Sequence, residues 1–248
     1  MSIPLAIVIP TYNERENIKL LVPRLFQLYP KAHVFIADDN SPDKTGDLVE
    51  KLGKKYPRLH VIRRQKKEGI GRAYIYAFKQ ILPLKPDLVV QMDADFSHDP
   101  LIIKDMLALS KKHQVVLGSR YITGISVINW ALGRVLLAYF ANVYVRRVTG
   151  MKIMDSTGGF KCFHRKVLES INLDRIGSDG YSFQIEMNYA AWRLGFKIVE
   201  TPIIFVDRQK GVSKMSRKII FEALFKVLTL PFRRTSSYSN KTQQNKKY

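Results

Sequence analysis

Cysteine is nearly absent from this sequence: Cys162 is the only one in 248 residues, so the chain cannot form an internal disulfide. That usage is typical of a reducing compartment. Apolar runs of about 18 residues, which predict membrane-spanning helices, are also missing. The first residues lack the basic segment of a secretory signal peptide, and the five histidines lack the spacing of zinc ligands. We therefore expect no disulfide framework, membrane span, signal peptide or structural zinc site.

Acidic residues are scarce relative to basic ones, with 21 Asp and Glu against 41 Lys and Arg and a formal net charge of +20. Such a charge favours an anionic partner, which could be nucleic acid, anionic lipid or a phosphorylated substrate. The apolar fraction of 46% and the charged fraction of 25% are otherwise those of a globular protein. We predict one domain over residues 1–232 and a basic, polar, disordered tail over residues 233–248.

Apolar runs alternate with helical patterns through the first half of the chain. The expected strands cover residues 5–10, 34–38, 59–63, 88–92 and 115–118, and the expected helices cover residues 14–28, 45–56, 71–82 and 100–112. This alternation predicts an α/β fold with a mostly parallel central sheet flanked by helices. In the second half we expect helices at 128–148, 181–194 and 217–232, and short strands at 197–201 and 203–207.

Two carboxylates, Asp93 and Asp95, follow the apolar run at 88–92 directly. Oxygen ligands at the end of a strand suit hard divalent cations such as Mg²⁺ or Mn²⁺, which are often shared with substrate phosphates. Such a cation stabilises charge on a departing diphosphate. The alternative is that both residues are solvated loop acids, because so short a pattern also recurs by chance.

Polar clusters follow three of the expected strands, at residues 11–14, 38–43 and 93–99. Ligands of open α/β sheets bind beyond the carboxyl ends of the strands, so we expect the three clusters to meet in one cleft. There Tyr12 could stack on a nucleobase and Glu14 could accept hydrogen bonds from a base or ribose. The alternative for each cluster is a turn that starts a helix.

Several cations occur where phosphates would need them. Arg120 lies two residues after the strand expected at 115–118, and Arg134, Arg208 and Lys214 follow downstream. Such a group could hold a diphosphate and a second phosphate, although each residue alone could be a solvated surface charge. The segments 155–161 and 180–186 could shape an acceptor pocket. We interpret His98 as a loop residue that caps the next helix, and Cys162 as a core residue.

Eight short motifs occur in a fixed order. They are PTYNE at 10–14, DDNSPD at 38–43, GIG at 69–71, MDADFSH at 92–98, GSRY at 118–121, GGFK at 158–161, GYSFQIE at 180–186 and DRQKGVSK at 207–214. In this order they resemble the family 2 inverting glycosyltransferases, specifically the dolichol-phosphate or polyprenol-phosphate mannose synthases. The match spans about residues 3–230, and the motif at 207–214 is the one that narrows it to this branch.

The resemblance implies a GT-A type nucleotide-sugar transferase fold and a role for each matching residue. Asp95 and Arg120 would be catalytic, and Ser97 stands where many relatives carry a Gln as third metal ligand. The residues around the guanosine would be Pro10, Tyr12, Glu14, Ala37 and Asp39, and Met92 and Ala94 would line the donor site. Asp93 and Asp95 would bind Mg²⁺ or Mn²⁺ together with the diphosphate. Arg120 would lie at the sugar–phosphate junction, and Arg208 and Lys214 would close over the phosphates. Arg134 would meet the acceptor phosphate.

The activity implied by the resemblance is transfer of mannose from GDP-mannose to a dolichyl or polyprenyl phosphate, with inversion. A related enzyme that uses UDP-glucose is the first alternative. A nucleic-acid-binding protein is the second, although the sequence has no basic–aromatic stripe or recognised binding motif. Amphipathic helices at 128–148 and 217–232 predict peripheral attachment to the cytoplasmic side of a membrane. Many relatives carry C-terminal transmembrane helices that this sequence lacks, so an integral membrane partner stays open.

Overall fold

The computed structural model describes residues 3–206 and 224–240. A seven-stranded sheet forms its centre, in the order β3-β2-β1-β4-β7-β5-β8. β7 is antiparallel to β4 and β5, and the other pairs are parallel, so the expected mostly parallel sheet is confirmed. The strands are β1 (Ile3–Thr11), β2 (His33–Asp38), β3 (Leu59–Arg63), β4 (Pro86–Gln91), β5 (Val115–Ser119), β7 (Lys161–His164) and β8 (Ile198–Pro202).

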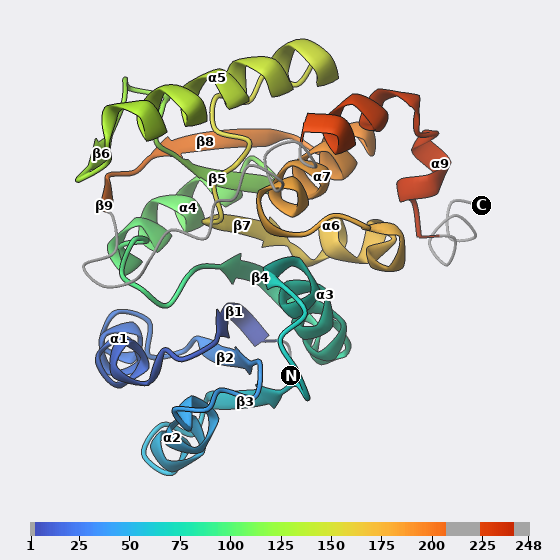
Figure 1. Cartoon of the computed structure of the whole chain (residues 1–248). Helices are drawn as coiled ribbons and strands as arrows, with labels where there is room; N and C mark the ends of the chain where they lie inside the picture. The colour runs from blue at the N-terminus through green and yellow to red at the C-terminus, as the bar shows by residue number, and fades with distance from the viewer. Residues whose placement is uncertain (1–2, 207–223, 241–248) are drawn as a thin grey trace.

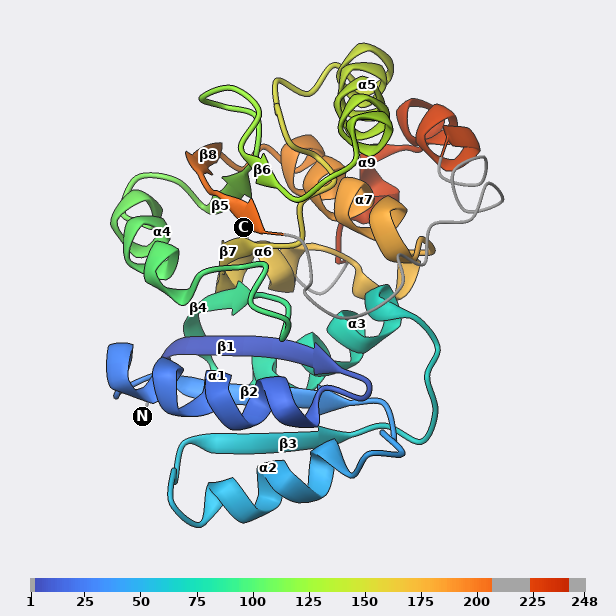
Figure 2. The same ribbon diagram turned by 60° about the vertical axis from the view of Figure 1, so that its left-hand side comes forward.

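Helices cover both faces of this sheet, which gives three layers (Figures 1 and 2). The α-helices are α1 (Arg15–Leu28), α2 (Thr45–Gly53), α3 (Ile70–Ile81), α4 (Ile103–Ser110), α5 (Leu132–Thr149), α6 (Arg165–Ser170), α7 (Gly180–Arg193) and α9 (Thr235–Tyr238). Short 3-10 turns are η1 (Leu82–Leu84), η2 (Pro100–Ile102), η3 (Leu173–Arg175) and η4 (Leu230–Phe232). A separate two-stranded sheet pairs β6 (Val127–Ile128) with β9 (Phe205–Val206).

The apolar side chains of β1 pack in the core on both faces of the sheet, because successive side chains of a strand point to opposite faces. Ala6 and Val8 pack in the cluster that includes residues of α3 and α7. Ile7 and Ile9 pack in the other cluster, with residues of α1 and α4. Cys162 on β7 is buried in that second cluster, as expected. This double-sided burial holds the carboxyl ends of β1, β2 and β4 at one edge.

The second half departs from the expected boundaries in two places. The helix expected at 128–148 begins only at Leu132, because Val127 and Ile128 pair with β9 and Asn129 has a positive φ of 64°. Of the helix expected at 217–232, residues 224–229 are helical and η4 follows them, while 217–223 lie outside the described residues. The Tyr144 hydroxyl of α5 donates to the Leu224 carbonyl oxygen at 2.9 Å, so these two helical segments are in contact.

The expectation of a disordered tail is wrong for residues 233–240. Tyr238 is 1% exposed and packs against Tyr189 of α7. The Asn172 N–H donates to the Tyr238 carbonyl at 2.7 Å, and Ile171 and Ser239 form a β-bridge. One buried aromatic side chain and these backbone bonds thus anchor a segment whose composition is polar. Residues 241–248 lie outside the described part of the chain.

Within the described residues, no helix is both long enough and apolar enough to cross a membrane.

Candidate active site

The loops after β1 and β2 are bonded to each other at the carboxyl edge of the sheet. The Thr11 hydroxyl donates to Asp38 Oδ1 at 3.0 Å, and the Asn13 N–H donates to the Ser41 hydroxyl oxygen at 3.1 Å. The Ser41 hydroxyl in turn donates to Asp38 at 2.6 Å. The expected meeting of these two clusters is therefore confirmed, and Asp38 is the residue that organises the turn.

The residues expected around the nucleoside lie beside these loops. The Lys67 ammonium is 3.8 Å from the centre of the Tyr12 ring, and Glu14 accepts a hydrogen bond from the Asn17 amide at 2.7 Å. Asp39 forms a buried ion pair with Arg64. Burial raises the pKa of Asp39, although the Arg64 guanidinium opposes that rise. The sequence did not predict Arg64 as the partner of Asp39, because Arg64 lies outside the motif at 38–43 and no local pattern links the two residues.

Other residues expected to line the donor site have side chains in the core. Ala37 and Met92 are fully buried and Ala94 is 3% exposed, whereas Pro10 is half-buried. The Met92 carbonyl accepts a hydrogen bond from the buried Tyr74 hydroxyl at 3.1 Å. Because the side chains of Ala37, Met92 and Ala94 are buried, main-chain atoms are the groups that these three residues could offer to a ligand, and their place in the donor site stays a prediction.

The two carboxylates of the Asp-x-Asp motif follow β4 and are held by their own loop. Ser97 donates to Asp95 Oδ1 twice, from its backbone N–H at 3.1 Å and from its hydroxyl at 2.6 Å. The Asp93 N–H donates to His98 Nδ1 at 3.0 Å. Among the described residues, no three His, Cys, Asp or Glu side chains form a metal-binding group. A cation here would therefore have two carboxylates and need further oxygen ligands from a substrate.

His98 anchors the loop after β4 through its ring, so the interpretation of His98 as a helix cap is wrong. Its buried ring stacks on Phe160 with ring centres 4.9 Å apart, and burial lowers its pKa, which favours the neutral imidazole that accepts from Asp93. The helix cap is Asp99 instead, whose carboxylate accepts from the Leu101 N–H at 3.0 Å.

Arg120 is buried in an ion pair that sequence reasoning missed. Its Nε and Nη2 each donate to the Asp155 carboxylate at 2.7 Å, and its backbone N–H donates at 3.0 Å. Nη2 also donates to the Thr157 hydroxyl at 2.8 Å. Although burial alone would raise the pKa of Asp155, the guanidinium lowers it below its ordinary value. From the sequence, the segment 155–161 is expected only to shape an acceptor pocket, because Asp155 is 35 residues from Arg120 and nothing local marks the pairing.

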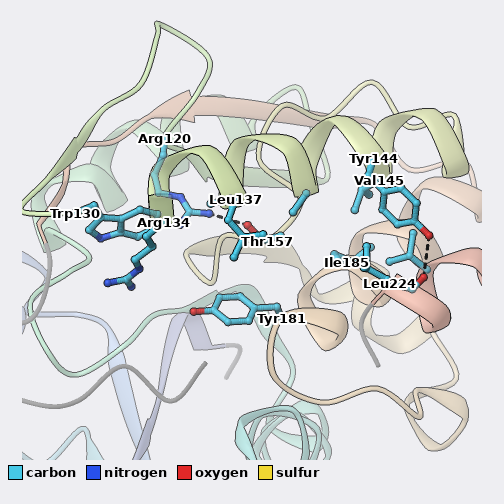
Figure 3. A pocket seen from close by; sticks show the side chains of 13 residues that line it. Arg120, Trp130, Arg134, Leu137, Tyr144, Val145, Thr157, Tyr181, Ile185 and Leu224 are labelled. Atoms are coloured by element: carbon cyan, nitrogen blue, oxygen red, sulfur yellow. Dashed lines mark hydrogen bonds between the residues drawn. The ribbon is translucent and has the colours of Figure 1, made fainter. Parts of the chain in front are cut away.

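A cavity of about 90 Å³ lies next to this ion pair (Figure 3). Arg120, Trp130 and Arg134 lie at one end, where the Arg134 guanidinium is 4.0 Å from the Trp130 ring centre. The other end is mainly apolar and is formed by α5, α7 and the helical residues 224–229. The lining at that end includes Tyr144, Val145, Ile185 and Leu224, and Leu137 lies beside Arg120. The segments 155–161 and 180–186 contribute Thr157, Tyr181 and Ile185, so both do shape a pocket.

The loop before β7 connects this pocket to the Asp-x-Asp loop. A Cβ atom on Gly159 would lie 3.8 Å from Asp93 Oδ2 and 3.4 Å from the His98 ring, so the glycine lies beside both. The Gln91 amide donates to the Gly159 carbonyl at 2.8 Å. Beneath them, the fully buried Lys161 donates to the Gln184 carbonyl at 2.8 Å, and burial lowers its pKa strongly. The structure thus brings Asp93, Asp95, Arg120 and Arg134 around one region, whereas Arg208 and Lys214 lie outside the described residues.

Sequence comparisons identify relatives along nearly the whole chain. The family model described as glycosyl transferase family 2 matches residues 6–171. The chain is 44% identical to polyprenol monophosphomannose synthase of Mycolicibacterium smegmatis, over 89% of this chain and 84% of that protein. It is 40% identical to undecaprenyl-phosphate mannosyltransferase of Micrococcus luteus, over 89% and 90%. With dolichol-phosphate mannosyltransferase of Pyrococcus furiosus the identity is 36%, over 88% and 61%.

Solved structures with the same fold include glucosyl-3-phosphoglycerate synthase from Mycobacterium tuberculosis. Its complex with phosphoglyceric acid superposes with a TM-score of 0.68 at 17% identity, over 93% of this chain and 80% of that one. Its complex with Mn²⁺, UDP-glucose and phosphoglyceric acid gives 0.67 at 15% identity, over 96% and 81%. At this identity the likeness shows the fold alone, which is the expected GT-A type. Together with the sequence matches, it shows that this chain belongs to glycosyl transferase family 2, within the branch of the polyprenyl-phosphate mannose synthases.

Proposed function

We propose that this chain transfers mannose from GDP-mannose to a dolichyl or polyprenyl phosphate, with inversion, to give a polyprenyl β-mannosyl phosphate and GDP. The observation that carries the proposal is an identity of 36–44% with three enzymes, one named for synthesis of polyprenol monophosphomannose and two named as mannosyltransferases of undecaprenyl phosphate and dolichol phosphate. That identity extends over 88–89% of this chain.

The cavity beside Arg120 and Arg134 supports the acceptor assignment. Its two ends differ in chemistry, with two guanidinium groups at one end and aliphatic side chains of α5, α7 and residues 224–227 at the other. A phosphate with a hydrocarbon chain has the same polarity along its length. Arg134 would hold the phosphate, because a guanidinium can donate two parallel hydrogen bonds to it. The first isoprene units would then contact the apolar end.

The donor would lie across the carboxyl edge of β1, β2 and β4. Tyr12, Glu14 and Asp39 would contact the guanosine, with main-chain atoms near Ala37 and Met92 completing the pocket. Asp93 and Asp95 would hold Mg²⁺ or Mn²⁺ together with the diphosphate, and the cation supplies positive charge to the leaving GDP. The oxygen ligands fit this role because both carboxylates lie on the loop after β4, and hydrogen bonds to Ser97 and His98 fix that loop. Ser97 would act mainly by orienting Asp95, and Arg208 and Lys214 would close over the phosphates.

Attack by the acceptor phosphate would not need a strong general base. A phosphate monoester is largely anionic at neutral pH, since its second pKa is about 6, so its oxygen can attack the anomeric carbon directly. Arg120 would lie at the sugar–phosphate junction, where Asp155 fixes the plane of its guanidinium. Catalysis would therefore rest on positioning and on fixed positive charge. A single displacement on the face opposite to GDP gives inversion.

Membrane attachment would bring the pocket to its lipid. Large apolar side chains are exposed on α5 and on the C-terminal helical segment, including Leu132, Leu136, Phe140, Phe225, Leu228 and Phe232. An amphipathic surface of this kind, with a net charge of +20, would lie in the headgroup region of an anionic leaflet. We place the protein peripherally on the cytoplasmic side, alone or beside an integral membrane partner.

The test is transfer of labelled sugar to a short polyprenyl phosphate in detergent. GDP-mannose should support transfer and UDP-glucose should not. Chelation with EDTA should abolish the reaction, and Mg²⁺ or Mn²⁺ should restore it. The matched control is the same polyprenol without its phosphate, which should accept nothing. Preferential use of UDP-glucose would replace the donor assignment. The proposal fails if neither donor is used and the protein instead binds nucleic acid tightly at physiological salt.

A further inference from the structure

A second cavity, of about 620 Å³, lies between η3 and the C-terminal segment, and it shares no lining residue with the cavity beside Arg134. All its lining residues have polar side chains and none is acidic. They are Asn172, Arg175, Arg233, Arg234, Ser236, Ser237, Tyr238 and Ser239. Three arginines and three serines in one cavity are unusual for a surface that merely needs solubility, because like charges placed close together repel each other.

The walls of this cavity are fixed by backbone hydrogen bonds between residues 66 and 70 positions apart in the sequence. The Asn172 N–H donates to the Tyr238 carbonyl at 2.7 Å, and the Asn240 N–H donates to the Ser170 carbonyl at 2.8 Å. The Tyr238 ring is buried, with its centre 5.8 Å from that of Tyr189. The arginines and serines are therefore carried on an ordered frame, as a binding site requires.

The positive charge of the cavity is only partly neutralised. Arg233 forms an ion pair with the buried Glu186, so one of the three guanidinium groups is compensated. Arg175 and Arg234 are exposed and form no ion pair with any residue in the described ranges 3–206 and 224–240. The acid next to Arg175 in sequence, Asp174, is taken by Lys79. Two arginines thus line the cavity without a carboxylate partner among the described residues.

A neutral donor completes the lining. The Tyr238 hydroxyl is buried and makes no hydrogen bond of ordinary geometry with any described residue. Burial raises the pKa of Tyr238 to about 12, although the Arg233 guanidinium opposes the rise, so the hydroxyl keeps its proton at neutral pH. The nearby Arg233 guanidinium can only donate, so among the described residues the hydroxyl proton has no acceptor, which is costly unless a ligand or water supplies one.

We propose that this cavity binds a phosphate group, carried either by the headgroup of an anionic lipid or by a free phosphate compound. Arg175 and Arg234 would neutralise it, and the Ser236 and Ser239 hydroxyls would donate to its oxygens. The Ser237 hydroxyl already donates to the Arg234 carbonyl at 2.6 Å, so it lines the cavity without a free proton. The volume lies within the range of small-ligand sites. Phe232, which is 88% exposed, directly precedes Arg233. An apolar side chain at the edge of a basic cavity is the arrangement that a lipid headgroup and its chains would use.

The first experiment titrates inorganic phosphate into the full chain in the presence of EDTA and follows the ³¹P NMR line width. The test variant is Arg175→Gln with Arg234→Gln. The matched control is Lys111→Gln with Lys112→Gln, which removes the same charge from two exposed lysines after α4. All titrations are made in the Arg134→Gln background, which removes the proposed acceptor phosphate site. In that background we expect the arginine pair to lose about tenfold or more in affinity for inorganic phosphate, with less than a twofold change in the lysine control. An equal loss in the lysine control, or no loss in the arginine pair, overturns the proposal.

The second experiment distinguishes the two sources of phosphate by cosedimentation with vesicles of phosphatidylglycerol and phosphatidylcholine. If a lipid headgroup is the ligand, the arginine pair reduces binding to the anionic vesicles several-fold more than the lysine pair, and neither pair affects pure phosphatidylcholine. If a free compound is the ligand, phosphate affinity falls while both pairs bind the vesicles equally. Mannosyl transfer in detergent should be unchanged in the arginine pair, so failure here is separate from failure of the proposed function.

Discussion

Replacement of Asp155 by alanine should strongly destabilise the protein, because it removes the counterion of a buried arginine. The Asp155 side chain is fully buried and the Arg120 side chain is 5% exposed. The carboxylate accepts three hydrogen bonds from Arg120, two from the guanidinium and one from the backbone. These three N–H groups lose the Asp155 acceptor in Asp155→Ala, and the Arg120 guanidinium stays in a position where only 5% of the side chain is exposed.

The expected loss is about 3–5 kcal/mol in the free energy of unfolding, the range for removal of one partner of a buried ion pair. That is a large part of the roughly 5–15 kcal/mol that holds a typical domain together. Asp155→Asn retains an acceptor oxygen of nearly the same shape, so it should cost less, about 1–3 kcal/mol. The order of the two variants follows from the hydrogen bonds and does not depend on the absolute values.

Urea unfolding followed by circular dichroism measures these losses. The chain offers a matched control in Asp47, which also pairs with an arginine, Arg63, at 2.6 Å, but at the surface with 56% and 45% of the two side chains exposed. Asp47→Ala should change stability only slightly, since exposed pairs contribute little and Arg63 keeps Glu50. Equal losses in Asp155→Ala and Asp47→Ala would refute the argument that burial makes the Arg120 pair important.

The pH dependence gives an independent check. The folded-state pKa of Asp155 is lowered by Arg120, so its contribution is complete above the unfolded value of about 3.9 and is lost as the pH falls through the folded value. The stability difference between wild type and Asp155→Ala should therefore be constant from about pH 5 to pH 7 and should shrink below about pH 4. A difference that grows in acid would have the wrong sign.

Three further predictions concern activity and the membrane. Asp95→Ala should abolish transfer with an unchanged circular dichroism spectrum, whereas Asp105→Ala, which removes an exposed acid of α4, should be active; near-normal turnover of Asp95→Ala would rule out its role on the metal. Arg134→Ala should raise the apparent KM for the lipid phosphate about tenfold or more and that for GDP-mannose little; equal effects would indicate a structural arginine. Phe225→Ser with Leu228→Ser should weaken cosedimentation with anionic vesicles, and added salt should weaken it further; unchanged binding would exclude this surface as the anchor.

Much of the fold could be predicted because the signals are local. Each predicted strand of the first half lies within one or two residues of an observed one, since a buried parallel strand is a continuous apolar run bounded by turns. The errors occur where tertiary contacts override composition. Val127 and Ile128 leave the expected helix to pair with β9. The polar segment 233–240 is ordered by Tyr238, a single aromatic residue whose burial no local pattern reveals.

The candidate site was predictable where it depends on strand ends and not where it depends on pairing across the chain. Asp93 and Asp95 are marked by the apolar run before them. Nothing local marks Asp155 as the partner of Arg120, because the pairing depends on the position of β7. The motif at 92–98 includes His98, but its role could not be predicted because it depends on Phe160, which directly precedes β7 and stacks on the His98 ring.

The position of β7 explains why these separate signals form one site. β7 is inserted antiparallel between β4 and β5, so the loop that precedes it runs past the carboxyl ends of both neighbours. β4 ends in the Asp-x-Asp loop and β5 ends next to Arg120. The loop at 155–160 therefore touches both, through Gly159 beside Asp93 and Asp155 on Arg120. A Cβ atom at position 159 would meet Asp93 and the His98 ring only at ordinary contact distances of 3.8 and 3.4 Å. The path of this loop, and not the absence of a side chain, therefore brings Asp93 and Arg120 to one short segment of backbone.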